Sequence, residues 1–134
     1  MITKNKLVIL ICFYFIIMIG CKNNPEATEE IFDITGIWTI TYNHPQFNHT
    51  VTSIYTFSGG STGSVTSDNG ASGNYTFSEN NVSFDLTKNI DDMGNVTNSY
   101  TGNSSNYNNM SGSLEQSFED YPQIKYQANW TASR

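Results

Sequence analysis

Cysteine is nearly absent from this chain of 134 residues, which contains only Cys12 and Cys21. Cys12 lies inside an apolar N-terminal run, and Cys21 closely follows that run. The rest of the chain has no cysteine that could form a disulfide or bind a metal, so packing must stabilise its fold.

Positive charge is also scarce, with six lysine and arginine residues against twelve aspartate and glutamate residues. Lys4 and Lys6 precede the apolar run, which leaves four basic residues against twelve acids and a net charge of −8 for the remainder. Because nucleic-acid binding depends on lysine and arginine contacts to phosphate, this balance argues against a nucleic-acid partner.

Helical patterns are missing from Gly36 onward. No segment there repeats apolar residues at positions i, i+3, i+4 and i+7 with good helix formers between them. Threonine, serine, asparagine, tyrosine and glycine dominate instead, and these residues favour strands and turns. The sequence therefore predicts an all-β fold, and the chain length predicts one folded domain.

Catalytic signatures are weak. The segment Gly59-Gly60-Ser61-Thr62-Gly63 matches the G-x-S-x-G pattern of esterases, which requires a strand-to-helix elbow and a histidine later in the chain. The only histidines, His44 and His49, precede Ser61. A hairpin turn explains the glycines, so we expect no catalytic residue and no enzyme.

Metal-binding patterns are weak as well. His44 and His49 have no third ligand at a spacing that zinc sites use. The pairs Asp91-Asp92 and Glu119-Asp120 lack the spaced acidic loop of an EF-hand. We therefore expect neither a metal nor a cofactor.

A targeting segment is present at the N-terminus. Lys4 and Lys6 precede Leu7–Ile19, an uncharged apolar run of thirteen residues. A bilayer core requires about 20 residues, so this run is too short to span it and instead fits a signal peptide.

The end of the run resembles the lipobox of bacterial lipoproteins, in which an apolar, a tolerated and a small residue precede a cysteine: Met18, Ile19, Gly20 and Cys21. This resemblance implies cleavage after Gly20 and lipid on Cys21, which would hold the protein on a membrane. An ordinary secretory signal or a signal anchor is the alternative. Lys22 stands where inner-membrane lipoproteins carry aspartate, so the resemblance also implies the outer membrane.

These features divide the chain into three parts. Residues 1–20 form the predicted signal peptide, residues 21–34 the lipidated cysteine with a polar, acidic tether, and residues 35–134 the folded domain. An extended tether of this length would hold the domain on the order of 40 Å from the bilayer.

Apolar and polar residues alternate within the predicted domain, as is typical of strands with one buried face. The clearest series are Trp38, Ile40, Tyr42; Val82, Phe84, Leu86; and Ile124, Tyr126, Ala128, Trp130, Ala132. Turn signals, among them residues 59–60 and 103–106, delimit about eight strands. We predict these strands near 36–43, 50–58, 62–67, 73–78, 82–88, 96–102, 107–116 and 123–133.

Eight such strands bury their apolar faces either by closing into a barrel or by stacking as a sandwich. The predicted inward faces carry many aromatic side chains: Trp38, Tyr42, Tyr55, Phe57, Tyr75, Phe77, Phe84, Tyr100, Tyr126 and Trp130. An eight-stranded barrel holds either side chains or one small ligand. So many rings favour a filled core over a large cavity.

The first and last strands resemble those of lipocalins. Gly36 and Trp38 match the G-x-W motif of the first lipocalin strand, and residues 129–134 resemble the closing strand of lipocalin-like bacterial lipoproteins of Bacteroidota type. The resemblance implies an eight-stranded antiparallel up-and-down barrel, closed by Gly36, Trp38, Trp130 and Arg134. It also implies that Arg134 stacks on Trp38, a favourable cation–π arrangement.

The same resemblance implies a membrane-anchored protein that binds a small apolar ligand in the mouth of its barrel. The alternative is a structural or interaction module of the cell surface, with a filled core and loops that contact protein or glycan. Exposed loop aromatics, for instance Phe47, Tyr107 and Tyr121, would favour the alternative.

Overall fold

The computed structural model describes residues 32–44 and 46–134, which form eight strands. They are β1 (Gly36–His44), β2 (His49–Gly59), β3 (Thr62–Ser67), β4 (Ser72–Ser78), β5 (Asn81–Ile90), β6 (Gly94–Asn106), β7 (Asn109–Phe118) and β8 (Lys125–Ser133). The predicted signal peptide, its cleavage residues Met18, Ile19 and Gly20, and the lipidation residue Cys21 lie outside the described residues.

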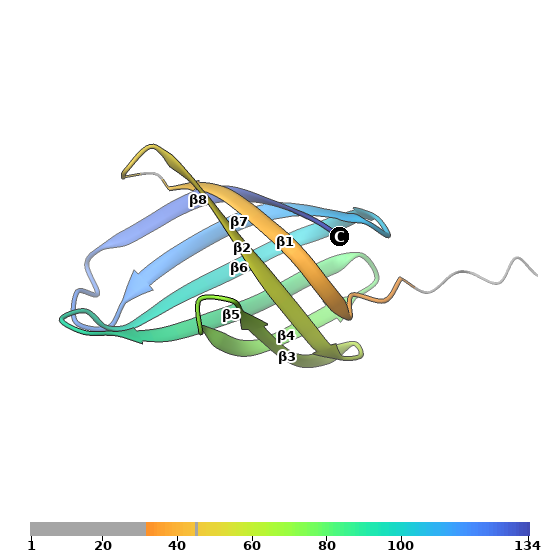
Figure 1. Cartoon of the computed structure of the whole chain (residues 1–134), viewed down its shortest axis with the longest axis horizontal. Helices are drawn as coiled ribbons and strands as arrows, with labels where there is room; N and C mark the ends of the chain where they lie inside the picture. The colour runs from red at the N-terminus through yellow and green to blue at the C-terminus, as the bar shows by residue number, and fades with distance from the viewer. Residues whose placement is uncertain (1–31, 45) are drawn as a thin grey trace, which may run out of the picture. The chain divides into compact units, whose positions relative to one another are not determined.

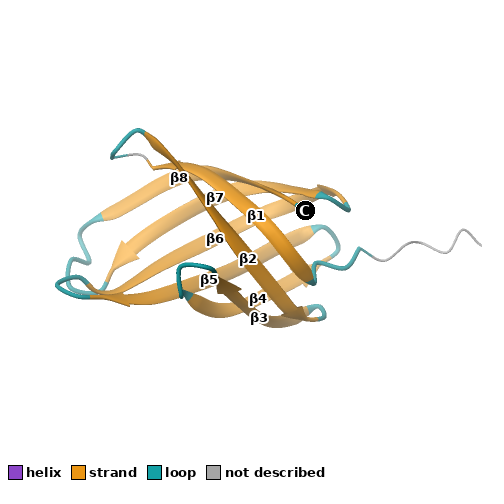
Figure 2. Cartoon of the chain, viewed as in Figure 1, coloured by secondary structure: helices purple, strands orange, loops and turns teal. Residues whose placement is uncertain are grey.

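Each strand pairs antiparallel with the next, and β8 pairs with β1, so the sheet closes into a barrel (Figure 1). The described part of the chain consists of strands and loops (Figure 2). The predicted eight-stranded antiparallel up-and-down barrel is therefore confirmed, and the sandwich is excluded. None of the described residues belongs to a helix long and apolar enough to span a membrane.

The strand boundaries agree with the predicted ones to within two residues, except at the end of β6. The turn predicted at residues 103–106 is wrong, because β6 continues to Asn106 and the turn comprises Tyr107 and Asn108. Asn106 shapes this turn, since its Oδ1 accepts hydrogen bonds at 2.9 Å from the backbone of Asn108 and from the side chain of Asn109.

The start of β8 also differs from the prediction. Ile124, which we expected to point inward, precedes the strand and is 36% exposed. Its backbone N–H bonds the carbonyl oxygen of Tyr121 at 2.9 Å, so Ile124 belongs to the turn that leads into β8.

Aromatic rings fill the middle of the barrel. Eight of the ten aromatic side chains predicted to point inward are buried, while Tyr42 and Tyr126 are half-buried. Phe84 and Tyr100 stack with centroids 4.4 Å apart, and the Trp130 ring meets both at steep angles. The preference for a filled core over a large cavity agrees with this packing.

Glycine makes room for this packing in β6 and β7. Gly102 and Gly112 are cross-strand partners. A Cβ on Gly112 would lie 1.9 Å from the carbonyl oxygen of Thr101, and one on Gly102 would lie 2.7 Å from the Trp130 ring. Both positions therefore exclude any side chain.

The end of the barrel where β1 begins is covered by the segment that precedes it. Ile34 is buried, and its carbonyl oxygen accepts a hydrogen bond from Trp38 Nε1 at 2.8 Å. Arg134 Cζ lies 4.7 Å from the centroid of the Trp38 ring, as the lipocalin resemblance implies. Arg134 Nη1 also donates to the carbonyl oxygens of Asp33 and Thr35. We call this the capped end.

Gly36 joins the capping segment to β1. Its φ of +119° belongs to a region that L side chains rarely adopt. Hydrogen bonds from the Thr35 backbone and hydroxyl lower the pKa of Asp33, so the Asp33 carboxylate fixes the turn that precedes Gly36.

Candidate ligand site at the open end of the barrel

The opposite end of the barrel carries the β1–β2, β3–β4, β5–β6 and β7–β8 loops. Here the wall is low, because β3 and β4 span six and seven residues while the flanking β2 and β5 span eleven and ten. β3 pairs only with Tyr55–Gly59 of β2, so the first part of β2 pairs with β1 alone. The β3–β4 hairpin stops short of this end (Figure 1), which we call the open end.

Half-buried side chains point inward at the open end. They continue the inward-facing series of β1, β6, β7 and β8, in which most side chains deeper in the barrel are buried and Ala128 is half-buried. We call them the open-end cluster: Tyr42, His44, Asn98, Gln116, Phe118 and Tyr126. The interior thus changes from apolar in the middle of the barrel to mixed polar and aromatic at this end.

Two amides of the cluster face each other across β6 and β7. Asn98 and Gln116 are cross-strand partners, and Gln116 Nε2 donates to Asn98 Oδ1 at 2.9 Å. This bond uses one donor of Gln116 and one acceptor site of Asn98. The Gln116 carbonyl oxygen and the Asn98 amide hydrogens retain capacity to bind a ligand.

Aromatic rings lie beside the amide pair. Tyr126 is the cross-strand partner of Gln116, and its ring centroid lies 5.5 Å from that of His44 and 5.7 Å from that of Phe118. A hollow of about 10 Å³, lined by Tyr42, His44, Gln116 and Tyr126 among others, lies between them. Such a volume holds about one water, so a larger ligand would displace these side chains.

Buried phenols lie beneath the cluster. Tyr55 Oη and Tyr100 Oη are 2.6 Å apart. Burial raises the pKa of Tyr55 to about 12 and raises the pKa of Tyr100 far above its usual range. Burial also raises the pKa of Tyr42, whose phenol lies within electrostatic range of both. All three hydroxyls are therefore neutral at physiological pH and can donate as well as accept.

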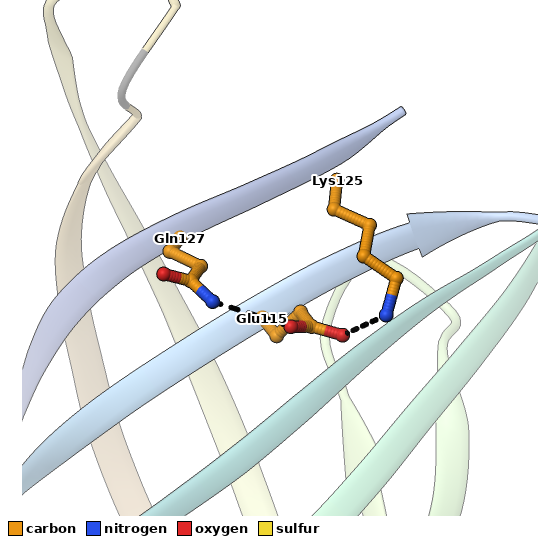
Figure 3. Close-up of polar contacts among 3 residues, drawn as sticks. All are labelled: Glu115, Lys125 and Gln127. Atoms are coloured by element: carbon orange, nitrogen blue, oxygen red, sulfur yellow. Dashed lines mark hydrogen bonds and ion pairs between the residues drawn. The ribbon is translucent and has the colours of Figure 1, made fainter. Parts of the chain in front are cut away.

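A polar network on the outer face holds the strand that carries Tyr126. Lys125 Nζ lies 2.7 Å from Glu115 Oε1, and Gln127 Nε2 donates to Glu115 Oε2 at 3.3 Å (Figure 3). The hydrogen bond from Lys125 is the main cause that lowers the pKa of Glu115. Because β8 pairs with β1 only over Trp130–Ser133, this network helps β7 to position the first half of β8.

Carboxylates surround the open end. The loops there carry Asp68, Asp91, Asp92, Glu119 and Asp120. Two lysines also lie toward this end: Lys88 Nζ donates to the carbonyl oxygen of Asn69 at 2.6 Å, and Lys125 pairs with Glu115. The electrostatic potential at the open end is consequently negative.

The two histidines and the serine of the esterase-like segment lie at opposite ends of the barrel. His44 and His49 are cross-strand partners at the open end, with ring centroids 5.8 Å apart. Ser61 lies in the β2–β3 turn at the capped end, so the G-x-S-x-G segment is the predicted hairpin. Within residues 32–44 and 46–134, no three His, Cys, Asp or Glu side chains are grouped to hold a metal.

The loop aromatics are exposed but do not form one surface. Phe47 is 64% exposed at the open end, and Tyr121 is 43% exposed in the β7–β8 loop of the same end. Tyr107 is 43% exposed at the capped end. Sequence reasoning missed Asn98 and Gln116, although the signal was available: each amide occupies a position where the alternation calls for an apolar residue.

A groove of about 520 Å³ lies on the outer face of β6, β7 and β8. Hydroxyl, amide and carboxylate side chains line most of it: Ser99, Thr101, Ser113, Glu115, Gln127 and Asn129. Its polar lining differs from the aromatic lining of the open-end cluster.

No family model matches the chain, and comparison with curated proteins gives no match. Among solved structures, the chain is similar to EF1p2_mFAP2b bound to DFHBI, with a TM-score of 0.58 and 13% sequence identity. The similarity covers 75% of this chain and 92% of that chain. At this identity the similarity shows the fold alone, which is that of a lipocalin-like β-barrel.

Proposed function

We propose that this chain is a membrane-anchored lipoprotein whose barrel binds a small, largely apolar molecule at its open end. The observation that carries the proposal is the open-end cluster, in which half-buried rings and one amide pair point inward, across the barrel from the low wall formed by β3 and β4. Ligand sites combine apolar walls with a few placed polar groups, and the mouths of β-barrels are frequent positions for them.

Two further findings support a site at the mouth. Stacked rings such as Phe84 and Tyr100 occupy the middle of the barrel, which leaves the open end as the place for a ligand. The similar barrel EF1p2_mFAP2b was solved with DFHBI bound, which is a precedent for ligand binding by this fold.

Titration with the neutral fluorescent dye Nile red tests ligand binding. Ala128 lines the hollow between Tyr42 and Tyr126, so Ala128→Phe fills it, whereas Asn129→Phe places the same ring on the outer face. We expect saturable binding by the wild type and by Asn129→Phe, and binding weakened at least about tenfold by Ala128→Phe. No saturable binding by the wild type, in a protein shown by circular dichroism to be folded, would contradict the proposal.

The anchor is tested separately. The lipobox-like segment that ends at Cys21 supports lipid attachment, and Lys22 supports the outer membrane. Mass spectrometry of protein from its host membrane should show the acyl mass on Cys21, and density fractionation should place the protein with the outer membrane. Cys21→Ala should release it from membranes. A Cys21→Ala variant that stays membrane-bound would indicate a signal anchor instead.

A second candidate function is contact with a protein or glycan of the cell surface. The outer groove of β6–β8 favours it, because that groove is large and lined by hydrogen-bonding side chains. Binding to a glycan array that is lost in Asn129→Leu, which alters the groove, and retained in Gln116→Leu, which alters the open-end cluster, would support this function over the first.

A further inference from the structure

The side chains of the open-end cluster restrict what it can bind, provided that the proposed function holds. The rings of His44, Tyr126 and Phe118 follow one another across β1, β8 and β7 with centroid spacings of 5.5 and 5.7 Å. These are the spacings at which aromatic rings pack on one another. The ring planes are inclined by 56° and 87°, so the three rings offer both faces and edges to a ligand. An aromatic molecule of one or two rings can pack edge-to-face against them, which a flexible alkyl chain cannot do.

The amide pair adds a polar requirement. Within the described part of the chain, the bond from Gln116 to Asn98 leaves one carbonyl oxygen and one set of amide hydrogens facing the interior. A ligand that matches them must carry both a hydrogen-bond donor and an acceptor. A carboxamide attached to a ring has both.

The surrounding charges disfavour an anion. Carboxylates of three loops stand around the open end, and the Lys88 ammonium is already bonded to the Asn69 carbonyl. An ionised ligand carboxylate would approach through a negative potential, which raises the free energy of its bound state. Fatty-acid anions therefore fit this site poorly.

We infer that the open-end cluster selects neutral aromatic molecules bearing a carboxamide-like group, and that it discriminates against carboxylates of the same shape. The inclined rings of His44, Phe118 and Tyr126 supply aromatic faces and edges for packing, and Asn98 with Gln116 supplies the hydrogen bonds.

Three naphthalene probes of matched shape test this inference by fluorescence titration at pH 8, where free histidine is neutral. They are 2-naphthamide, 2-naphthoate and naphthalene. We expect 2-naphthamide to bind at least about tenfold more tightly than either of the others, as two hydrogen bonds would give. Gln116→Leu should remove its advantage over naphthalene, whereas Asn129→Leu on the outer face of β8 should leave the order unchanged.

The outcomes separate this inference from the proposed function. If Nile red binds but 2-naphthamide binds no better than naphthalene or 2-naphthoate, the inference fails and the ligand site stands. If Nile red and all three probes fail to bind, both fail. If Gln116→Leu keeps the full preference for 2-naphthamide, the amide pair is not the selecting group and the inference is overturned.

Discussion

The hydroxyl pair of Tyr55 and Tyr100 offers the sharpest test of how the interior is held together. Both side chains are buried, with exposures of 2% and 0%, and their Oη atoms are 2.6 Å apart. Replacing Tyr100 with phenylalanine keeps the ring that stacks on Phe84 at 4.4 Å, but it leaves the Tyr55 hydroxyl without this partner. The substitution therefore isolates the hydrogen bond from the packing.

The expected loss of stability differs between removing one hydroxyl of the pair and removing both. A buried polar group that loses its partner costs about 1–3 kcal/mol, whereas removing both partners leaves no orphaned group. We expect Tyr100→Phe and Tyr55→Phe each to lower the free energy of unfolding by about 2 kcal/mol. The double variant should lose about 2 kcal/mol or less in total, so the coupling energy should be at least about 2 kcal/mol.

Urea unfolding followed by circular dichroism measures these free energies, provided that the m-value stays constant. Tyr75→Phe is the control, because its hydroxyl bonds the Gly60 carbonyl at the capped end and should add independently to Tyr100→Phe. Effects of Tyr55→Phe and Tyr100→Phe that sum to within about 0.5 kcal/mol would refute a coupled pair.

Three further predictions concern pH, the cap and the glycines. Tyrosine ionises near pH 10 in the unfolded state, whereas the pKa of Tyr55 in the folded state is about 12. The free energy of unfolding should therefore keep its full value below pH 10 and fall between pH 10 and pH 12. Urea unfolding midpoints measured across that range check this prediction. Arg134→Ala should destabilise the barrel by about 1–3 kcal/mol in thermal unfolding, with partial recovery in Arg134→Lys, since only arginine offers a planar group to Trp38. Gly112→Ala should cost more than about 2 kcal/mol, whereas Gly60→Ala, with nothing within 4 Å of its Cβ, should stay within about 0.5 kcal/mol.

Alternation of apolar and polar residues was enough to predict the strands, because most inward positions carry an apolar side chain that is buried. The series from Trp38 and from Val82 appears in the structure as predicted. The end of β6 escaped prediction, since Asn103–Asn106 has the composition of a turn. Pairing with β7 and the side chain of Asn106 decide the outcome there, and both depend on tertiary contacts.

The candidate site was harder to predict than the fold. The resemblance to lipocalins pointed to the mouth of the barrel but named no residue in it. The alternation assigns Asn98 and Gln116 to inward positions, but only the register of β6 and β7 shows that the two amides meet inside the barrel. The low wall at the open end likewise could not be predicted, because it depends on how far β3 and β4 extend in the paired sheet.

The two ends of the barrel differ in a way that closure alone does not require. The β1–β8 seam pairs only Thr39–Tyr42 with Trp130–Ser133, and Arg134 reinforces it by bonding the capping segment. At the open end, the ring contact of His44 with Tyr126 joins the described residues of β1 and β8, and Gln116 occupies an inward position where leucine would bury more apolar surface. Polar side chains at inward positions lower the stability of a barrel, so they are expected where they serve binding. This contrast is why we propose a ligand site at the open end and not elsewhere on the barrel surface.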